Sequence, residues 1–160
     1  MKSHSHGSSV IAFPSELEIV TTREFHAPMA LVFEVLTNPE HVREHFAPFD
    51  CHVTECAIDL QPGGTYHIVF VCADGAECSF RGTYQEIKPP TRTVATWVFE
   101  GWPDAEAVES VDLQEAHGIT TLTNTLTFRD QAGRAHMTTF DGQEDSYNKL
   151  EDYLGSLLEG

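Results

Sequence analysis

The sequence predicts an α+β fold in which a curved antiparallel sheet of about six to seven strands wraps around a long C-terminal helix, with two short helices after the first strand. Short, turn-rich joints separate the β-type runs, and such links favour antiparallel neighbours over parallel crossovers. Only the C-terminal residues carry a long amphipathic pattern, so this one helix must cover the apolar face of the sheet. A chain of 160 residues is sufficient for one such core.

The first elements are a strand and two short helices. Apolar and β-branched residues over 16–25 predict the strand, which ends before Pro28. From Pro28 to about Thr37 the apolar residues recur at helical spacing, and proline suits the first helical position because its missing N–H is not needed there. Asn38 and Pro39 then predict the N-cap and the first residue of a second, shorter helix.

Six further strands follow, and residues that favour turns bound each of them. The last strand alternates most cleanly, because Leu122, Asn124 and Leu126 share one face while threonines occupy the other. Asn124 is therefore a polar residue on an apolar face, and we expect it to be buried. The six runs span residues 51–60, 65–73, 78–88, 93–100, 108–116 and 119–129.

The C-terminal helix is expected over residues 141–158. Asp141 and Glu144 have the spacing of an N-cap residue and its partner three positions later. An apolar stripe then runs along one side of the helix, and we expect this stripe to pack on the sheet. The stripe consists of Tyr147, Leu150, Leu154, Leu157 and Leu158.

The charge balance excludes several classes of partner. Nine Lys and Arg against 25 Asp and Glu give a formal net charge of -16, which repels nucleic acids and anionic membrane surfaces. No apolar run is long enough for a membrane span, and the N-terminus lacks the apolar core of a secretory signal. The expected location is therefore the cytoplasm. Residues 1–14 are expected to form a disordered arm, and residues 15–160 a single domain.

Side chains that bind metals in proteins are present, but their spacing is uninformative. His41, His45, His52 and Cys56 can be drawn as a zinc site, yet such spacing is common by chance, and we expect packed or solvated histidines instead. We expect no metal and no cofactor. No GxSxG motif or Ser/Cys–His–Asp set occurs, so no catalytic residue is assigned.

All four cysteines are expected to be free thiols, because a chain of this size needs no cross-links. They are Cys51, Cys56, Cys72 and Cys78.

Several short motifs occur in an order that is similar to one known family. They are Thr22 to Pro28 (TREFHAP), Val32-Phe33, Asn38-Pro39-Glu40, Gly63-Gly64, Gly82 to Pro90 (GTYQEIKPP) and Trp97. Over roughly residues 15 to 158 the chain resembles proteins similar to the activator of Hsp90 ATPase, within the START-like and polyketide cyclase-like (SRPBCC) superfamily. The resemblance implies a helix-grip fold. Where the family often has tryptophan, this chain has His45-Phe46 and Gln143, which would make a cavity there more polar.

The resemblance further implies a deep pocket between the sheet and the C-terminal helix, which binds a hydrophobic small molecule in many relatives. The aromatic residues of this chain fall on segments that face one another in such a fold. We expect them to line the pocket, with core packing as the alternative for each. Asn124 would orient a ligand or brace a backbone group, since a buried amide needs a hydrogen-bond partner. The expected ligand-binding residues are Phe33, Tyr66, Phe70, Phe80, Tyr84, Trp97, Phe99, Asn124, Tyr147 and Leu150.

The leading functional interpretation is a non-catalytic protein that binds a hydrophobic or amphipathic small molecule. One alternative is a cyclase- or dehydratase-type enzyme in which a tyrosine or His67 moves a proton in the same cavity. Another is a partner-binding domain that regulates an Hsp90-type chaperone ATPase, and a homodimer also stays open. An acidic segment would serve such docking, although a solvated strand edge is the favoured interpretation of it. The segment comprises Glu100, Asp104, Glu106, Glu109, Asp112 and Glu115.

Overall fold

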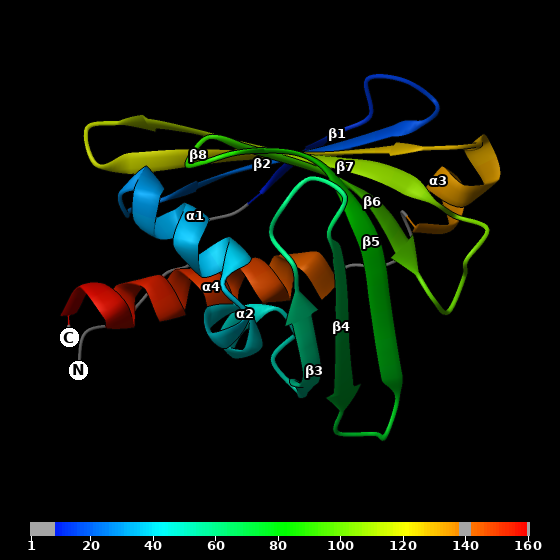
Figure 1. The fold of residues 1–160 in the computed structure, drawn as a ribbon, viewed down its shortest axis with the longest axis horizontal. Helices are drawn as coiled ribbons and strands as arrows, with labels where there is room; N and C mark the ends of the chain where they lie inside the picture. The colour runs from blue at the N-terminus through cyan, green and yellow to red at the C-terminus, as the bar shows by residue number, and fades with distance from the viewer. Residues whose placement is uncertain (1–8, 138–141, 160) are drawn as a thin grey trace.

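An eight-stranded antiparallel sheet bends around a long C-terminal helix in the computed structural model, which describes residues 9–137 and 142–159 (Figure 1). In chain order the elements are β1 (Val10–Ala12), β2 (Glu18–Phe25), α1 (Met29–Thr37), α2 (Pro39–His45), β3 (Cys51–Ile58), β4 (Thr65–Cys72), β5 (Glu77–Lys88), β6 (Arg92–Phe99), β7 (Ala107–Ala116), β8 (Ile119–Phe128), α3 (Gln131–Met137) and α4 (Gly142–Glu159). The strand order across the sheet is β1-β2-β8-β7-β6-β5-β4-β3, so β1 and β3 form the edges. Helices α1, α2 and α4 lie on the concave side, which confirms the predicted helix-grip fold (Figure 1).

The local signals at the first two helices and at the last hairpin have clear structural counterparts. The Asn38 side chain accepts a hydrogen bond from the Glu40 N–H at 3.0 Å, and Pro39 occupies the first helical position, as predicted. Pro28 is instead the N-cap residue of α1, because its ψ of 145° is extended and the helix begins one residue later than expected. His117 and Gly118 both have positive φ, at 55° and 78°, as a tight two-residue hairpin turn requires.

Two elements were not predicted, β1 and α3. β1 falls within the arm expected to be disordered, and it pairs with β2 so that Val10 lies opposite Thr22. A run of three residues carries no periodicity, so only the edge of β2 identifies it as a strand. Residues 1–8 of the predicted arm lie outside the described residues. α3 contains Gly133, a poor helix former, but the Asp130 carboxylate accepts the Gly133 N–H at 2.8 Å as an N-cap.

Helix α4 packs through its middle turns. Leu150 and Leu154 are only 1% and 3% exposed, whereas Leu157 and Leu158 at the end of the predicted stripe are exposed. The expected N-cap residue Asp141 lies outside the described residues. Neither α4 nor any other helix in the described ranges combines the length and apolar character needed to cross a membrane. The core around the buried leucines includes Phe25, Val32, Val35, Leu113 and Leu122.

The prediction of four free thiols is wrong for Cys51 and Cys72, which form a disulfide. These two residues are direct cross-strand partners in β3 and β4, so the strand register brings them together across 21 positions of sequence. Sequence spacing cannot reveal such a pair until the register is known. Cys56 and Cys78 are free. Because disulfides persist mainly in oxidising compartments, the cysteines no longer support the expectation of a cytoplasmic location.

Candidate functional site

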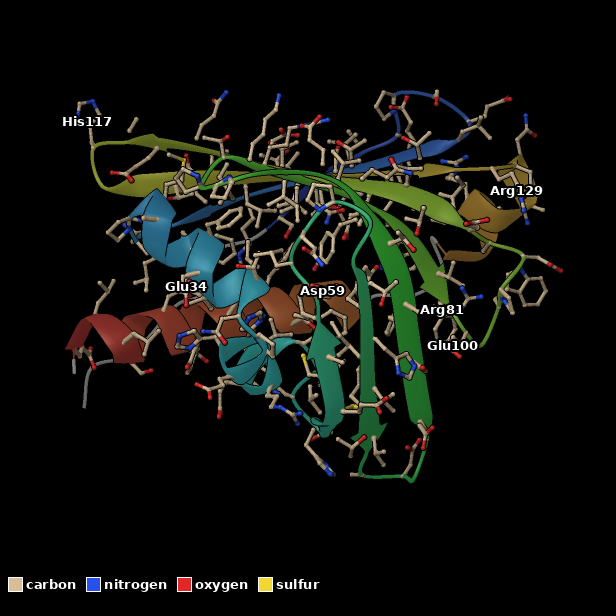
Figure 2. The ribbon with its side chains drawn as sticks, in the orientation of Figure 1. Glu34, Asp59, Arg81, Glu100, His117 and Arg129 are labelled. Carbon is tan, nitrogen blue, oxygen red and sulfur yellow. A yellow bond between two sulfur atoms is a disulfide. The ribbon has the colours of Figure 1, made fainter. Side chains whose placement is uncertain are left out.

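A cavity of about 210 Å³ lies between the concave face of the sheet and helices α1, α2 and α4. Figure 2 shows side chains of both layers reaching into this region. At its floor, the small side chain of Ala95 on β6 lies opposite Tyr84 on β5 and Glu109 on β7. This alanine leaves room where a larger residue would fill the space. The predicted binding residues that line the cavity are Phe33, Tyr66, Tyr84, Trp97, Asn124, Tyr147 and Leu150.

The other predicted residues, Phe70, Phe80 and Phe99, lie outside the cavity lining. The ring centroid of Phe80 is 5.9 Å from that of Phe70 and 5.2 Å from that of Phe99. It also lies 5.6 Å from the rings of Phe46 and Trp97, which are themselves cavity-lining residues. These rings fill the space beside the cavity with one another. Phe70 is buried and Phe80 and Phe99 are half-buried, so these three side chains pack against one another beside the cavity.

Glu109 is the polar cavity residue that the sequence analysis missed. The side-chain amide of Asn124 donates a hydrogen bond to Glu109 Oε2 at 2.8 Å, and both residues line the cavity. The prediction of a solvated strand edge is wrong, because β7 lies inside the sheet between β6 and β8. The sequence did contain a signal for Glu109. Every second residue of β7 points to the same face, and that face carries Ala107, Glu109, Val111 and Leu113. The pattern that singled out Asn124 also marks Glu109.

The surroundings of Glu109 raise the pKa of its carboxyl group. Burial raises the pKa of Glu109, and the hydrogen bond from Asn124 opposes this shift only in part. The described residues that line the cavity include no lysine and no arginine. Glu109 therefore has a hydrogen-bond donor in the empty cavity, but no lining Lys or Arg supplies a positive charge.

Two tyrosines face the same part of the cavity as neutral phenols. Burial raises the pKa of Tyr66 and of Tyr84, and the negative charge of nearby Glu109 raises both further. The Tyr66 hydroxyl donates to the Thr96 carbonyl oxygen at 3.1 Å, which fixes its ring 5.6 Å from that of Tyr84. Gly82 makes room for this arrangement, because a Cβ there would collide with the Tyr66 ring and the Thr96 carbonyl.

His45 and Phe46 line the cavity at the α2 end, where the sequence predicted a polar region. His45 Nε2 donates to the Val35 carbonyl oxygen at 2.8 Å, which assigns the proton to this nitrogen. Burial lowers the pKa of His45 to about 4, so the imidazole is neutral near physiological pH. The side chain of Gln143, the other residue of that prediction, lies outside the described part of the structure.

Apart from His45, the histidines whose side chains the structure describes do not line the cavity. His67 was a candidate for proton transfer, but the neighbouring residues Tyr66 and Ile68 face the cavity and His67 faces the other side of the sheet. On that side, His67 Nδ1 lies 2.6 Å from the Glu55 carboxylate, and His67 Nε2 lies 2.8 Å from the Glu100 carboxylate. Figure 2 labels Glu100, which lies at the margin of the sheet away from α4. Within the described ranges, no three His, Cys, Asp or Glu side chains gather in a way that would bind a metal ion.

Several residues of the acidic segment have local structural roles. Asp112 pairs with Arg92 at 2.7 Å, and the Glu115 carboxylate accepts the Met29 N–H at 2.7 Å, at the start of α1. The latter contact places a negative charge at the positive end of the helix dipole. These contacts tie the segment to its own fold, which is a structural use that the sequence did not predict.

A buried ion pair connects α4 to the sheet. The Arg23 side chain is 0% exposed and its guanidinium lies 3.1 Å from the Glu151 carboxylate. The same guanidinium lies 5.4 Å from the ring centroid of Phe25 and 6.0 Å from that of Tyr147. Since Tyr147 also lines the cavity, this contact helps to set where α4 covers it.

With this geometry described, comparison with protein families gives a match over residues 26–155 to the family described as Activator of Hsp90 ATPase homolog 1-like protein. The chain belongs to this family. The predicted resemblance is thus confirmed, and the matched range includes every residue that lines the cavity, from Phe33 to Leu150. A comparison with curated proteins finds no match.

Solved structures share the fold of this family member at low sequence identity. A Rhodobacter sphaeroides protein superposes with a TM-score of 0.85 at 19% identity, covering 92% of this chain and 99% of that chain. A Nitrosomonas europaea protein gives 0.79 at 22% identity, with coverage of 92% and 100%. DynU16, a protein of the dynemicin biosynthetic locus, gives 0.66 at 22% identity and covers 89% of this chain and 48% of that one. Identities this low show a common fold and leave function to the site.

Proposed function

We propose that this chain binds one small amphipathic molecule in the cavity beneath α4. The apolar part of the molecule would lie against the aromatic rings and its polar part beside Glu109 and Asn124. The observation that carries the proposal is a space of about 210 Å³ lined mainly by apolar side chains and one hydrogen-bonded polar pair. Pockets for small molecules typically have this composition, with a few polar groups that fix orientation. Packed protein cores leave few voids larger than a water molecule.

Apolar and polar cavity residues make different contributions to binding. Trp97, Phe33 and Tyr84 offer flat apolar surface, which supplies affinity at about 25 cal/mol per Å² buried. Asn124 and Glu109 supply directional hydrogen bonds, which select the orientation of the ligand. Leu150 contributes apolar surface from α4, on the side of the cavity that faces the sheet.

Two measurements test the proposal. Native mass spectrometry of freshly purified protein should show a retained small molecule. Calorimetry with the neutral aromatic probe 2-naphthylmethanol should give micromolar affinity, about -8 kcal/mol. Its heat-capacity change should be negative, because apolar surface is buried. Absence of both a retained molecule and probe binding would contradict the proposal.

A pair of phenylalanine substitutions provides the matched control. Ala95→Phe places a ring at the floor of the cavity, and it should abolish binding of 2-naphthylmethanol. Val108→Phe places the same ring on the opposite face of the neighbouring strand, where Val108 is 38% exposed, and it should leave binding unchanged. Equal binding by both variants would show that the probe binds elsewhere on the protein.

A further inference from the structure

We propose that Glu109 makes the cavity selective for a cationic amine, whose ammonium group binds the Glu109 carboxylate while an apolar or aromatic body fills the remaining space. The inference rests on the proposed function and names the chemical class of its ligand. It depends on the position of Glu109, on the charges around it and on the aromatic lining.

The position of Glu109 leaves part of its carboxyl group for a ligand. Asn124 donates to Oε2 at 2.8 Å and thereby holds the side chain in the cavity. Among the described residues, no side chain or backbone N–H donates to the other oxygen, Oε1. A carboxylate has about four acceptor sites, so most of its hydrogen-bonding capacity is unused.

The cavity lacks the positive charge that a buried carboxylate needs. No Lys or Arg occurs among its described lining residues, and the lining His45 is neutral because burial lowers its pKa to about 4. The other titratable groups that face the cavity are the phenols of Tyr66, Tyr84 and Tyr147, which carry no positive charge in any state. An ionised Glu109 therefore requires a cation from outside the protein.

The aromatic lining and the overall charge favour the same ligand. Tyr66, Tyr84 and Trp97 surround the region of Glu109, and aromatic faces attract cations, most strongly where water is excluded. The formal net charge of -16 raises the local concentration of cations and repels anions. Glu109 and the net negative charge of the protein would both repel a carboxylate ligand, whereas both would attract an ammonium group.

Binding of an amine should release a proton at pH values where Glu109 is protonated in the free protein. In the empty cavity, burial favours the protonated Glu109 carboxyl, whereas the bound ammonium favours the carboxylate, so the carboxyl proton leaves to solvent as the complex forms. Affinity for the amine should then rise about tenfold per pH unit below the pKa of Glu109 in the empty protein. A neutral ligand should show no such dependence.

Three probes with one common ring system test the inference on the full chain: 2-naphthylmethylamine, 2-naphthylmethanol and 2-naphthoic acid. By calorimetry near neutral pH, the amine should bind at least about tenfold more tightly than the alcohol, and the acid should not bind. Repeating the amine titration below the pKa of Glu109, in buffers of different ionisation enthalpy, should reveal proton release. In Glu109→Gln the amine should lose this advantage over the alcohol, together with the proton release.

The outcomes separate this inference from the proposed function. Equal affinity of wild-type protein for amine and alcohol would overturn the amine selectivity and leave the cavity as a general binding site. Failure of all three probes to bind would remove the proposed function together with the selectivity. If Glu109→Gln does not fold, the pH dependence of the wild-type protein still decides: relative to the alcohol, the amine should lose affinity as pH falls below the pKa of Glu109, and an amine whose affinity follows that of the alcohol at every pH does not pair with Glu109.

Discussion

The cavity beneath α4 and the aromatic cluster around Phe80 lie on the same concave face, and both contain aromatic side chains. In the cluster, Phe46, Phe70 and Phe99 place their ring centroids 5.2 to 5.9 Å from that of Phe80, so the rings occupy the space themselves. In the cavity, the floor contains Ala95 between larger neighbours, and space remains. A set of aromatic residues on facing strands therefore does not distinguish a binding site from a packed core.

Polar residues mark the difference between the two regions more reliably. The cluster around Phe80 consists of aromatic rings, whereas the cavity holds the Glu109–Asn124 pair. Burying a carboxyl group without a cation costs several kcal/mol or forces it to stay protonated. Packing alone gives no reason to retain such a group, so we interpret it as a cost in stability that serves binding.

The largest expected effect is a loss of stability on substitution in the aromatic cluster around Phe80. Phe70→Ala should lower the free energy of unfolding by about 3–5 kcal/mol, because Phe70 is buried among other rings. The affinity for 2-naphthylmethanol should stay within about threefold of wild type, since Phe70 does not line the cavity. Chemical denaturation and calorimetry measure the two quantities. Loss of binding in a folded Phe70→Ala protein would show that the two regions are not separate.

A somewhat smaller effect is expected for the helix that covers the cavity. Leu150→Ala should cost about 2–5 kcal/mol, because this side chain is 1% exposed in the core under α4. Leu158→Ala on the same helix should change stability by no more than about 0.5 kcal/mol, since Leu158 is 52% exposed. Equal denaturation midpoints for the two variants would contradict the packing of α4 on the sheet.

The α2 end of the cavity should respond to acid. The pKa of His45 falls from 6.5 to about 4 on folding, so below about pH 6.5 the unfolded chain binds a proton that the folded protein does not. Stability should therefore decline as pH falls through this window, by at most about 3 kcal/mol from His45 alone. His45→Gln cannot titrate and should lack this part of the decline.

Urea denaturation across this pH range measures the His45 effect as a difference between variant and wild type. His26→Gln is the control, because His26 is exposed and does not line the cavity. Parallel loss of stability in wild type and His45→Gln would show that the buried imidazole does not cause the acid sensitivity.

The smallest effect on stability is expected at the Glu109–Asn124 pair, and its pH dependence is opposite to that of His45. Burial raises the pKa of Glu109, so its contribution to stability is present while the carboxyl is protonated and is lost as pH rises through the folded-state pKa. Glu109→Gln should therefore gain stability over wild type in alkaline solution and lose that advantage in acid. Thermal denaturation at about pH 5 and about pH 9 tests this. Glu106→Gln is the control, since the Glu106 side chain is 43% exposed.

Elements with local sequence signals were predictable without the tertiary structure. The period-two alternation of β8, the Asn38-Pro39 start of α2 and the middle of the α4 stripe all depend on residues within one or two turns of each other. Neighbouring residues fix such patterns whatever the rest of the chain does. For this reason the fold, the family and the order of all elements except β1 and α3 followed from the sequence.

Contacts between residues on different strands depend on how the strands pair, which no local pattern predicts. Cys51 and Cys72 join because β3 and β4 pair in one register, and β1 exists because β2 offers an edge. Glu109 carried the same alternation signal as Asn124, but its role depends on β7 lying inside the sheet with that face toward α4. Whether aromatic rings leave a cavity depends on the summed volumes of side chains from six strands and three helices, and no local pattern records that sum.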